Sequence, residues 1–123
     1  MTDKLLFVKD NVRARDGRKF FSVGTIGFVS EIPIDLQIKM IDAALIELTE
    51  KVTWVIFKDC EERYLEDNGR TCVYPLALLD HKCKQKVYCI LDNYGSVEAL
   101  RKSAGDESIT TKYVMTMLLP EEY

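Results

Sequence analysis

The sequence contains no long hydrophobic run, which argues against a membrane-spanning protein. No apolar stretch approaches the roughly 18 residues that a transmembrane helix needs. Residues 1–4 include an acidic and a basic side chain, and the apolar stretch that follows, residues 5–8, is too short for a secretory signal peptide. We therefore expect a cytoplasmic protein that makes no membrane contact.

The sequence also lacks any cluster of cysteine and histidine, since its four cysteines are widely spaced and it has one histidine. The cysteines, Cys60, Cys72, Cys83 and Cys89, form no C-x-x-C pair, and His81 does not complete a zinc site with them at any usual ligand spacing. In a reducing cytoplasm such thiols stay free and behave as small hydrophobic side chains. The sequence therefore predicts no disulfide, no metal site and no cofactor.

Motifs of the common enzyme classes are missing as well. There is no phosphate-binding P-loop and no G-x-G-x-x-G fingerprint. The single histidine, His81, lies in a lysine-rich loop without a neighbouring pattern of nucleophile, base and orienting residue. Asp80-His81-Lys82 has the D-x-K form of a metal-dependent nuclease motif, but no predicted strand holds it. We therefore predict a protein that is not an enzyme, and a small metal-dependent nuclease is the third alternative.

What the sequence does have is the composition of one globular domain over residues 1–123. Apolar residues make up 47% of the chain and charged residues 30%, and 123 residues are enough to bury one core. The net charge is −3, so the molecule as a whole is not attracted to nucleic-acid polymers or anionic membranes. Any affinity for phosphate has to come from a local cluster of basic residues.

The N-terminal region has the pattern of a β-hairpin over about residues 4–29. Two stretches rich in strand-forming residues flank Asp16-Gly17, a dipeptide that suits a tight turn. Gly24 and Gly27 in the second stretch suggest a bulge, or a place where another backbone or a ligand comes close.

Two helices are predicted from apolar periodicity and from residues typical of helix ends. Pro33 suits the start of a helix over about residues 34–50, whose apolar stripe is broad enough to pack on a sheet and on a second subunit. A second helix is expected over about residues 96–104, where Gly105 ends it. A short third helix over residues 60–67 is possible, although the Asn-Gly that follows it could equally join two strands.

Apolar and alternating stretches predict the remaining strands. They cover about residues 52–57, 71–74, 86–91 and 109–119. With the hairpin, this order predicts a single α+β domain, with a mainly antiparallel sheet of about five to six strands and the two main helices packed on one face.

The predicted hairpin carries a cluster of basic residues that could bind an anion. Five of them fall within 11 positions: Lys9, Arg13, Arg15, Arg18 and Lys19. Strand alternation places Arg13 and Arg15 on the same face, where two guanidinium groups could bind phosphate oxygens. The plainer interpretation is an exposed hairpin that its charges keep soluble.

The turn before the second helix offers another anion site. Backbone amides of Gly95, Ser96 and Val97 have no acceptor within a helix that begins near Ser96, and the helix dipole favours negative charge there. Tyr94 could stack on a base or ribose, and Asn93 could hydrogen bond to a base edge. The plainer interpretation is that Asn93 or Ser96 caps the helix.

Together these features predict a non-catalytic, homo-oligomeric protein that binds or sequesters a phosphorylated, nucleotide-like small molecule. The expected ligand-binding residues are Arg13, Arg15, Asn93, Tyr94, Gly95 and Ser96. A short domain with so few motifs is typical of phage or mobile-element accessory proteins, which could sequester a nucleotide signal. The alternative is an interaction module or inhibitor that masks a partner surface through its charged hairpin and sheet edge.

Overall fold

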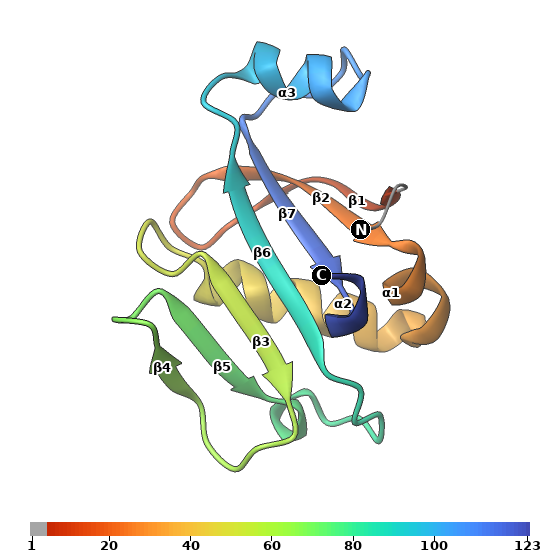
Figure 1. The fold of residues 1–123 in the computed structure, drawn as a ribbon, viewed down its shortest axis with the longest axis vertical. Helices are drawn as coiled ribbons and strands as arrows, with labels where there is room; N and C mark the ends of the chain where they lie inside the picture. The colour runs from red at the N-terminus through yellow and green to blue at the C-terminus, as the bar shows by residue number, and fades with distance from the viewer. Residues whose placement is uncertain (1–4) are drawn as a thin grey trace.

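The computed structural model describes the backbone of residues 5–123 and the side chains of residues 12–123. Within this range the chain forms one seven-stranded sheet and three α-helices (Figure 1). The strands are β1 (Leu5–Arg13), β2 (Lys19–Thr25), β3 (Trp54–Lys58), β4 (Tyr64–Glu66), β5 (Thr71–Pro75), β6 (Val87–Asn93) and β7 (Tyr113–Leu118). The α-helices are α1 (Ile26–Glu31), α2 (Ile34–Glu47) and α3 (Val97–Ala104), and Leu76–Leu79 and Pro120–Glu122 form short 3-10 helices.

The sheet is mixed, with the strand order β1-β2-β7-β6-β3-β5-β4. Strand β2 pairs parallel with β7, and β3 pairs parallel with β5. The other four neighbouring pairs are antiparallel. The predicted α+β class is therefore confirmed, while the sheet has more strands than expected and includes two parallel pairings that local patterns did not indicate.

The N-terminal hairpin forms around Asp16-Gly17 as predicted, and Gly17 takes the positive φ of 93° that a tight turn requires. Its second strand is shorter than expected, because α1 begins at Ile26. The Thr25 hydroxyl accepts a hydrogen bond from the Phe28 amide and so caps α1. Gly27 therefore lies in a helix and not in a strand bulge, and the group that approaches it closely is a side chain, the carboxylate of Glu122.

The main core lies between α2 and one face of the sheet (Figure 1). Leu36, Met40 and Ala44 of α2 are fully buried there, together with inward-facing side chains of β3, β6 and β7. The helix starts at Ile34 as expected and ends at Glu47, three residues before the predicted end at position 50. Gln37 is also buried, because its side-chain amide donates to the carbonyls of the last turn of α1.

The possible helix over residues 60–67 is not present. Residues 64–66 form β4, which pairs antiparallel with β5 at the free edge of the sheet. Asp67, Asn68 and Gly69 all have positive φ, at 53°, 55° and 82°, and make the turn between the two strands. Asn68-Gly69 therefore joins two strands, which is the other interpretation of this dipeptide.

Helix α3 lies beyond the ends of β6 and β7 (Figure 1). Its Leu100 packs with Val23, Ile109 and Val114 in a second small core, on the sheet face opposite to α2. The two main helices therefore do not share one face, as the sequence pattern had suggested. In the described residues no helix combines the length and apolar character needed to cross a membrane.

Candidate functional site

A cleft of about 240 Å³ opens on the α2 side of the sheet, where the chain leaves α2. We call it the Arg18 cleft. Its lining comes from the hairpin, from the segment between α2 and β3, and from β6 and β7: Arg18, Glu50, Thr53, Leu91, Asn93 and Tyr113. Four segments that are distant in the sequence therefore meet at this cleft.

Strand pairing brings these segments together. The antiparallel register of β6 and β7 sets Asn93 opposite Tyr113. The Leu91 amide donates to the Thr53 carbonyl at 2.9 Å, which fixes the entry to β3 beside β6. The parallel pairing of β2 with β7 brings the start of the hairpin's second strand, where Arg18 lies, next to Tyr113.

Arg18 is held in one position by groups of the protein. Its Nε donates to Oδ2 of Asp16 at 2.9 Å, and its backbone amide donates to the other oxygen of the same carboxylate. The guanidinium carbon lies 5.2 Å from the ring centre of Phe20 and 5.0 Å from that of Tyr113, within the range of a cation–π contact. Only 17% of the side chain is exposed, and its buried Nη2 has no hydrogen-bond partner among the described residues.

The other polar groups that line the cleft are Asn93, Glu50 and Thr53. Asn93 accepts a hydrogen bond from the Gly95 amide through Oδ1 at 2.8 Å, which orients its side chain. The Glu50 carboxylate is exposed at the rim, and Thr53 contributes to the wall. The cleft thus presents one arginine, one carboxylate, one amide, one hydroxyl and an aromatic ring.

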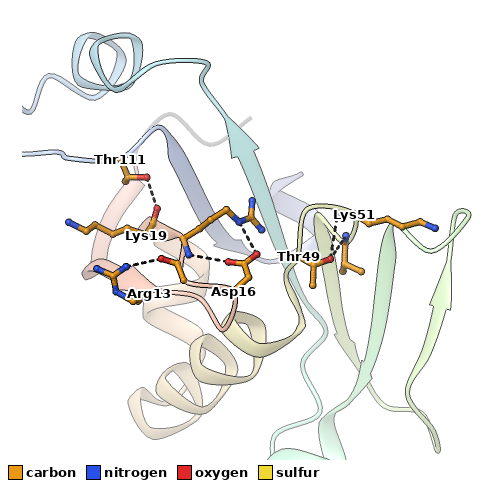
Figure 2. A network of polar contacts seen from close by, with 9 residues as sticks. Arg13, Asp16, Lys19, Thr49, Lys51 and Thr111 are labelled. Carbon is orange, nitrogen blue, oxygen red and sulfur yellow. Dashed lines mark hydrogen bonds and ion pairs between the residues drawn. The ribbon is translucent and has the colours of Figure 1, made fainter.

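The two predicted arginines lie outside the cleft. Arg13 is exposed and donates from Nη1 to the Gly17 carbonyl at 2.7 Å, and Figure 2 shows it on the side of Asp16 that faces away from Thr49. Arg15 lines a neighbouring hollow of about 320 Å³, together with Asp16, Ile46, Leu48 and Thr49. Both arginines are therefore exposed, and of the two only Arg15 lines this hollow.

The predicted turn residues also separate. Of Asn93, Tyr94, Gly95 and Ser96, only Asn93 lines the Arg18 cleft. Tyr94 lines a small hollow of about 90 Å³ beside α3. The Gly95 amide is occupied by Asn93, and the Ser96 hydroxyl accepts from the Ala99 amide and caps α3. Ser96 thus caps α3, and of the three amides expected to bind an anion the one of Gly95 already has an acceptor in the Asn93 side chain.

The residue that sequence reasoning passed over is Arg18. It belongs to the basic cluster of the hairpin, but strand alternation favours Arg13 and Arg15 as the pair that shares a face. The same alternation places Arg18 on the side of Phe20, which is fully buried. That inward position was the available signal. No local sequence signal indicates Glu50, Thr53 or Tyr113, because each of these residues reaches the cleft only through pairing of distant segments.

The cysteines and the histidine lie elsewhere. Burial raises the pKa of the Cys72 thiol to about 11, and burial also raises the pKa of Cys89. The Nε2 atom of His81 lies 3.4 Å from a carboxylate oxygen of Asp35, at the start of α2. Among the described residues no three His, Cys, Asp or Glu side chains gather as a metal site would require, and Asp80 of the D-x-K sequence ends the 3-10 helix Leu76–Leu79.

Comparison of the chain with models of known protein families, with curated proteins and with solved structures finds no significant match to any of them.

Proposed function

We propose that this chain binds a small phosphorylated, nucleotide-like molecule in the Arg18 cleft and holds it without transforming it. The observation that carries the proposal is the buried Nη2 of Arg18, which lacks an acceptor within the described residues. A buried donor without a partner costs about 1–3 kcal/mol, and more when the group is charged. Because Nη2 has almost no contact with solvent, the Arg18 side chain has to turn slightly toward the cleft before an anionic oxygen of a ligand can supply that acceptor through a charge-assisted hydrogen bond.

The surroundings of Arg18 favour binding because they hold the guanidinium in place before a ligand arrives. Asp16 fixes the Nε edge, and the rings of Phe20 and Tyr113 lie beside the guanidinium. A long side chain that is already ordered loses little conformational entropy when the ligand binds. An arginine kept this way acts as a fixed anchor for phosphate.

The remaining groups suit the rest of a nucleotide. The ring of Tyr113 offers a face on which a base or ribose could lie, and Asn93 and Glu50 can hydrogen bond to base or sugar hydroxyl groups. The cavity volume of about 240 Å³ is close to the lower end of the ~300–1,000 Å³ that ligand pockets occupy. A single nucleotide that also reaches the hollow beside Arg15 fits this space better than a polymer does.

Holding a nucleotide without turnover suits a protein that removes a nucleotide signal from solution. This is the role we assign in the setting of a phage or mobile-element accessory protein. The residues lining the cleft provide hydrogen bonds, charge and a stacking face, which are the means of binding and retention.

The test is isothermal titration calorimetry with mono-, di- and cyclic nucleotides, ribose 5-phosphate and inorganic phosphate. We expect at least one nucleotide to bind the wild type more tightly than phosphate alone. Arg18→Gln removes the charge and is expected to weaken binding tenfold or more, since a charged hydrogen bond contributes about 1.5–3 kcal/mol. Tyr113→Leu removes the stacking face and should weaken the binding of nucleotides more than the binding of inorganic phosphate.

Arg13→Gln is the matched control, because it removes the same charge from the same hairpin outside the cleft. Its affinity should stay near that of the wild type, and thermal melts should show all variants folded. If Arg13→Gln loses binding and Arg18→Gln keeps it, the ligand binds on the outer side of the hairpin. If no compound of the panel binds the wild type at millimolar concentration, the nucleotide proposal fails.

One observation favours the interaction module as the second candidate. Strand β4 lies at the free edge of the sheet, and its three residues are all exposed, including Tyr64 and Leu65. Such an edge can accept a strand from a partner protein. Leu65→Pro should abolish binding of such a partner, because proline removes a backbone donor and fixes φ. Arg18→Gln should leave binding of this partner unchanged.

A further inference from the structure

The charged groups of the Arg18 cleft indicate how much negative charge its ligand can carry. Of the residues that line the cleft, Arg18 and the exposed Glu50 are the charged ones. The charge of Arg18 is already offset in part, because its Nε lies 2.9 Å from a carboxylate oxygen of Asp16. Glu50 forms no ion pair with any side chain that the structure describes. The lining of the cleft therefore has no excess of positive charge.

The basic side chains nearest in sequence or space do not change this balance much. The ammonium group of Lys51 lies next to Gly69, in the turn between β4 and β5. Arg15 is exposed and lines the neighbouring hollow. The Nζ atom of Lys112 lies 5.7 Å from the ring centre of Tyr113, but Lys112 does not line the cleft. A ligand in the cleft thus meets one cation directly.

The hydrogen-bonding groups of the cleft suit a phosphate with few free oxygens. Arg18 can donate from its unpaired Nη2 and Thr53 from its hydroxyl group. Asn93 can donate from its side-chain NH2, because its Oδ1 already accepts from the Gly95 amide. The Glu50 carboxylate can only accept, so it can bind a hydroxyl group of a ligand but repels a phosphate oxygen.

Phosphate esters differ in how well they match these groups. A phosphate monoester has three free oxygens and carries about 1.5–2 negative charges at pH 7. A phosphodiester has one free oxygen fewer and carries a single negative charge. One arginine and two neutral donors can satisfy the diester, whereas the additional charge of the monoester has no second cation in the lining of the cleft.

We propose that the Arg18 cleft binds a phosphodiester in preference to a phosphate monoester, and that Glu50 determines this preference. The inference rests on the proposed function, because it names the class of nucleotide that the same cleft holds. Arg18 meets the single charge of the diester, while Glu50 accepts from a hydroxyl group of the ligand. With a monoester, the same carboxylate faces additional negative charge, and repulsion of this kind is how a site rejects a similar ligand.

The test compares the 5′-monophosphates of adenosine, guanosine, cytidine and uridine with their 5′-methyl and 3′,5′-cyclic diesters. A monophosphate and its methyl diester have the same base and sugar and differ by one methyl group, which removes one charge. Calorimetry is done at about pH 7.5, where the monoester is almost fully ionised because its second pKa is about 6. We expect at least one diester to bind the wild type about tenfold more tightly than the corresponding monoester.

Glu50→Gln tests the residue that is assigned the preference. Glutamine keeps the length and the carbonyl acceptor of glutamate but not its charge. The variant should bind the monoester about tenfold more tightly than the wild type does and should bind the diester almost unchanged. Glu31→Gln is the matched control, because it removes an exposed carboxylate at the end of α1, outside the cleft. It should keep the wild-type preference.

The outcomes separate this inference from the proposed function. If the wild type binds no nucleotide of either panel, both proposals fail. If it binds monoesters or nucleoside diphosphates as tightly as diesters, the preference is wrong and the proposed function stands. The assignment of Glu50 is wrong if Glu50→Gln leaves the ratio of the two affinities unchanged, or if Glu31→Gln alters this ratio to the same extent.

Discussion

At the scale of single residues, two buried polar atoms in the described part of the chain have no hydrogen-bond partner: Nη2 of Arg18 and Oγ of Ser22. They lie in different surroundings. Arg18 lines a cleft that a ligand can enter, whereas Ser22 is fully buried in β2 and lines none of the hollows described above. The unpaired atom of Arg18 therefore suggests a binding site, whereas the unpaired hydroxyl of Ser22 lowers the stability of the folded protein.

Replacing Ser22 with alanine should stabilise the protein. The substitution removes a buried hydroxyl without a partner, whose burial costs about 1–3 kcal/mol, and leaves almost the same shape. We expect the free energy of unfolding to rise by about 1 kcal/mol, measured by urea denaturation with an unchanged m-value.

Thr111→Val provides the control with the opposite sign. The Thr111 hydroxyl is also buried, but it donates to the Lys19 carbonyl and accepts from the Tyr113 amide. Its removal leaves both groups without that partner and should lower the free energy of unfolding by roughly 1–3 kcal/mol. If Ser22→Ala destabilises the protein to a similar extent, the Ser22 hydroxyl has an acceptor that the geometry does not reveal.

At the scale of elements, the C-terminal 3-10 helix joins the start of α1 through one side chain. The Glu122 carboxylate accepts from the Thr25 hydroxyl, from the Gly27 amide at 2.9 Å and from the Leu119 amide at 2.9 Å. Tyr123 follows and lies edge-on against Trp54, with ring centres 5.2 Å apart. The end of the chain is thereby fastened both to α1 and to the sheet face opposite α2.

This fastening should depend on pH. Desolvation opposes the charge of Glu122, but hydrogen bonds from Thr25 and from backbone amides outweigh it, so its pKa is lowered from the ordinary value of 4.5. A lowered pKa means that the stabilisation is complete above the pKa of the unfolded state and is lost as pH falls through the folded-state pKa. The wild type should therefore melt at a higher temperature than Glu122→Gln at neutral pH, and this difference should disappear as the pH falls below about 4.5. Melting temperatures measured across a pH series test this.

Glu121→Gln is the matched control for this prediction. Glu121 is the exposed neighbour of Glu122 in the same short helix. Its variant should follow the wild-type pH curve, and Glu122→Gln should melt below both at neutral pH. Parallel curves for wild type and Glu122→Gln down to pH 3 would show that the carboxylate does not hold the C-terminal segment.

At the scale of the whole molecule, the four cysteines, all free thiols in the structure, report on the core. Cys72 and Cys89 are fully buried, whereas Cys60 and Cys83 are partly exposed. Burial raises the pKa of both buried thiols, which leaves them protonated and unreactive at neutral pH. The two pairs should differ in how fast a thiol reagent modifies them.

In native protein at neutral pH, a thiol reagent should modify Cys60 and Cys83 first. Cys89 lies under α2 at the centre of the sheet, so its modification requires opening of the main core and should be slower by several orders of magnitude. Mass spectrometry of peptides after timed labelling gives the order. Equal rates for all four cysteines, or early loss of Cys89, would show that the core opens far more readily than its burial implies.

Local sequence signals predicted those elements whose ends are defined by nearby residues. Asp16-Gly17 indicated the hairpin, Pro33 indicated the start of α2, and Ser96 with Gly105 marked the two ends of α3. Each of these depends on backbone angles or hydrogen bonds within a few residues, which the neighbouring residue types determine. The same reasoning failed at α1, since its start depends on Thr25, whose hydroxyl also bonds to Glu122 at the other end of the chain.

The sequence by itself determined the α+β class, the broad apolar stripe of α2 and the clustering of basic residues on the hairpin. Only the tertiary structure decided the two parallel strand pairings, and with them which arginine meets Asn93 and Tyr113. The reason is physical: neighbours a few residues apart set turns, caps and periodicity, but strand order follows from how the whole apolar surface is buried. Arg18 became the candidate anchor because β2 packs beside β7, more than 85 residues away along the chain.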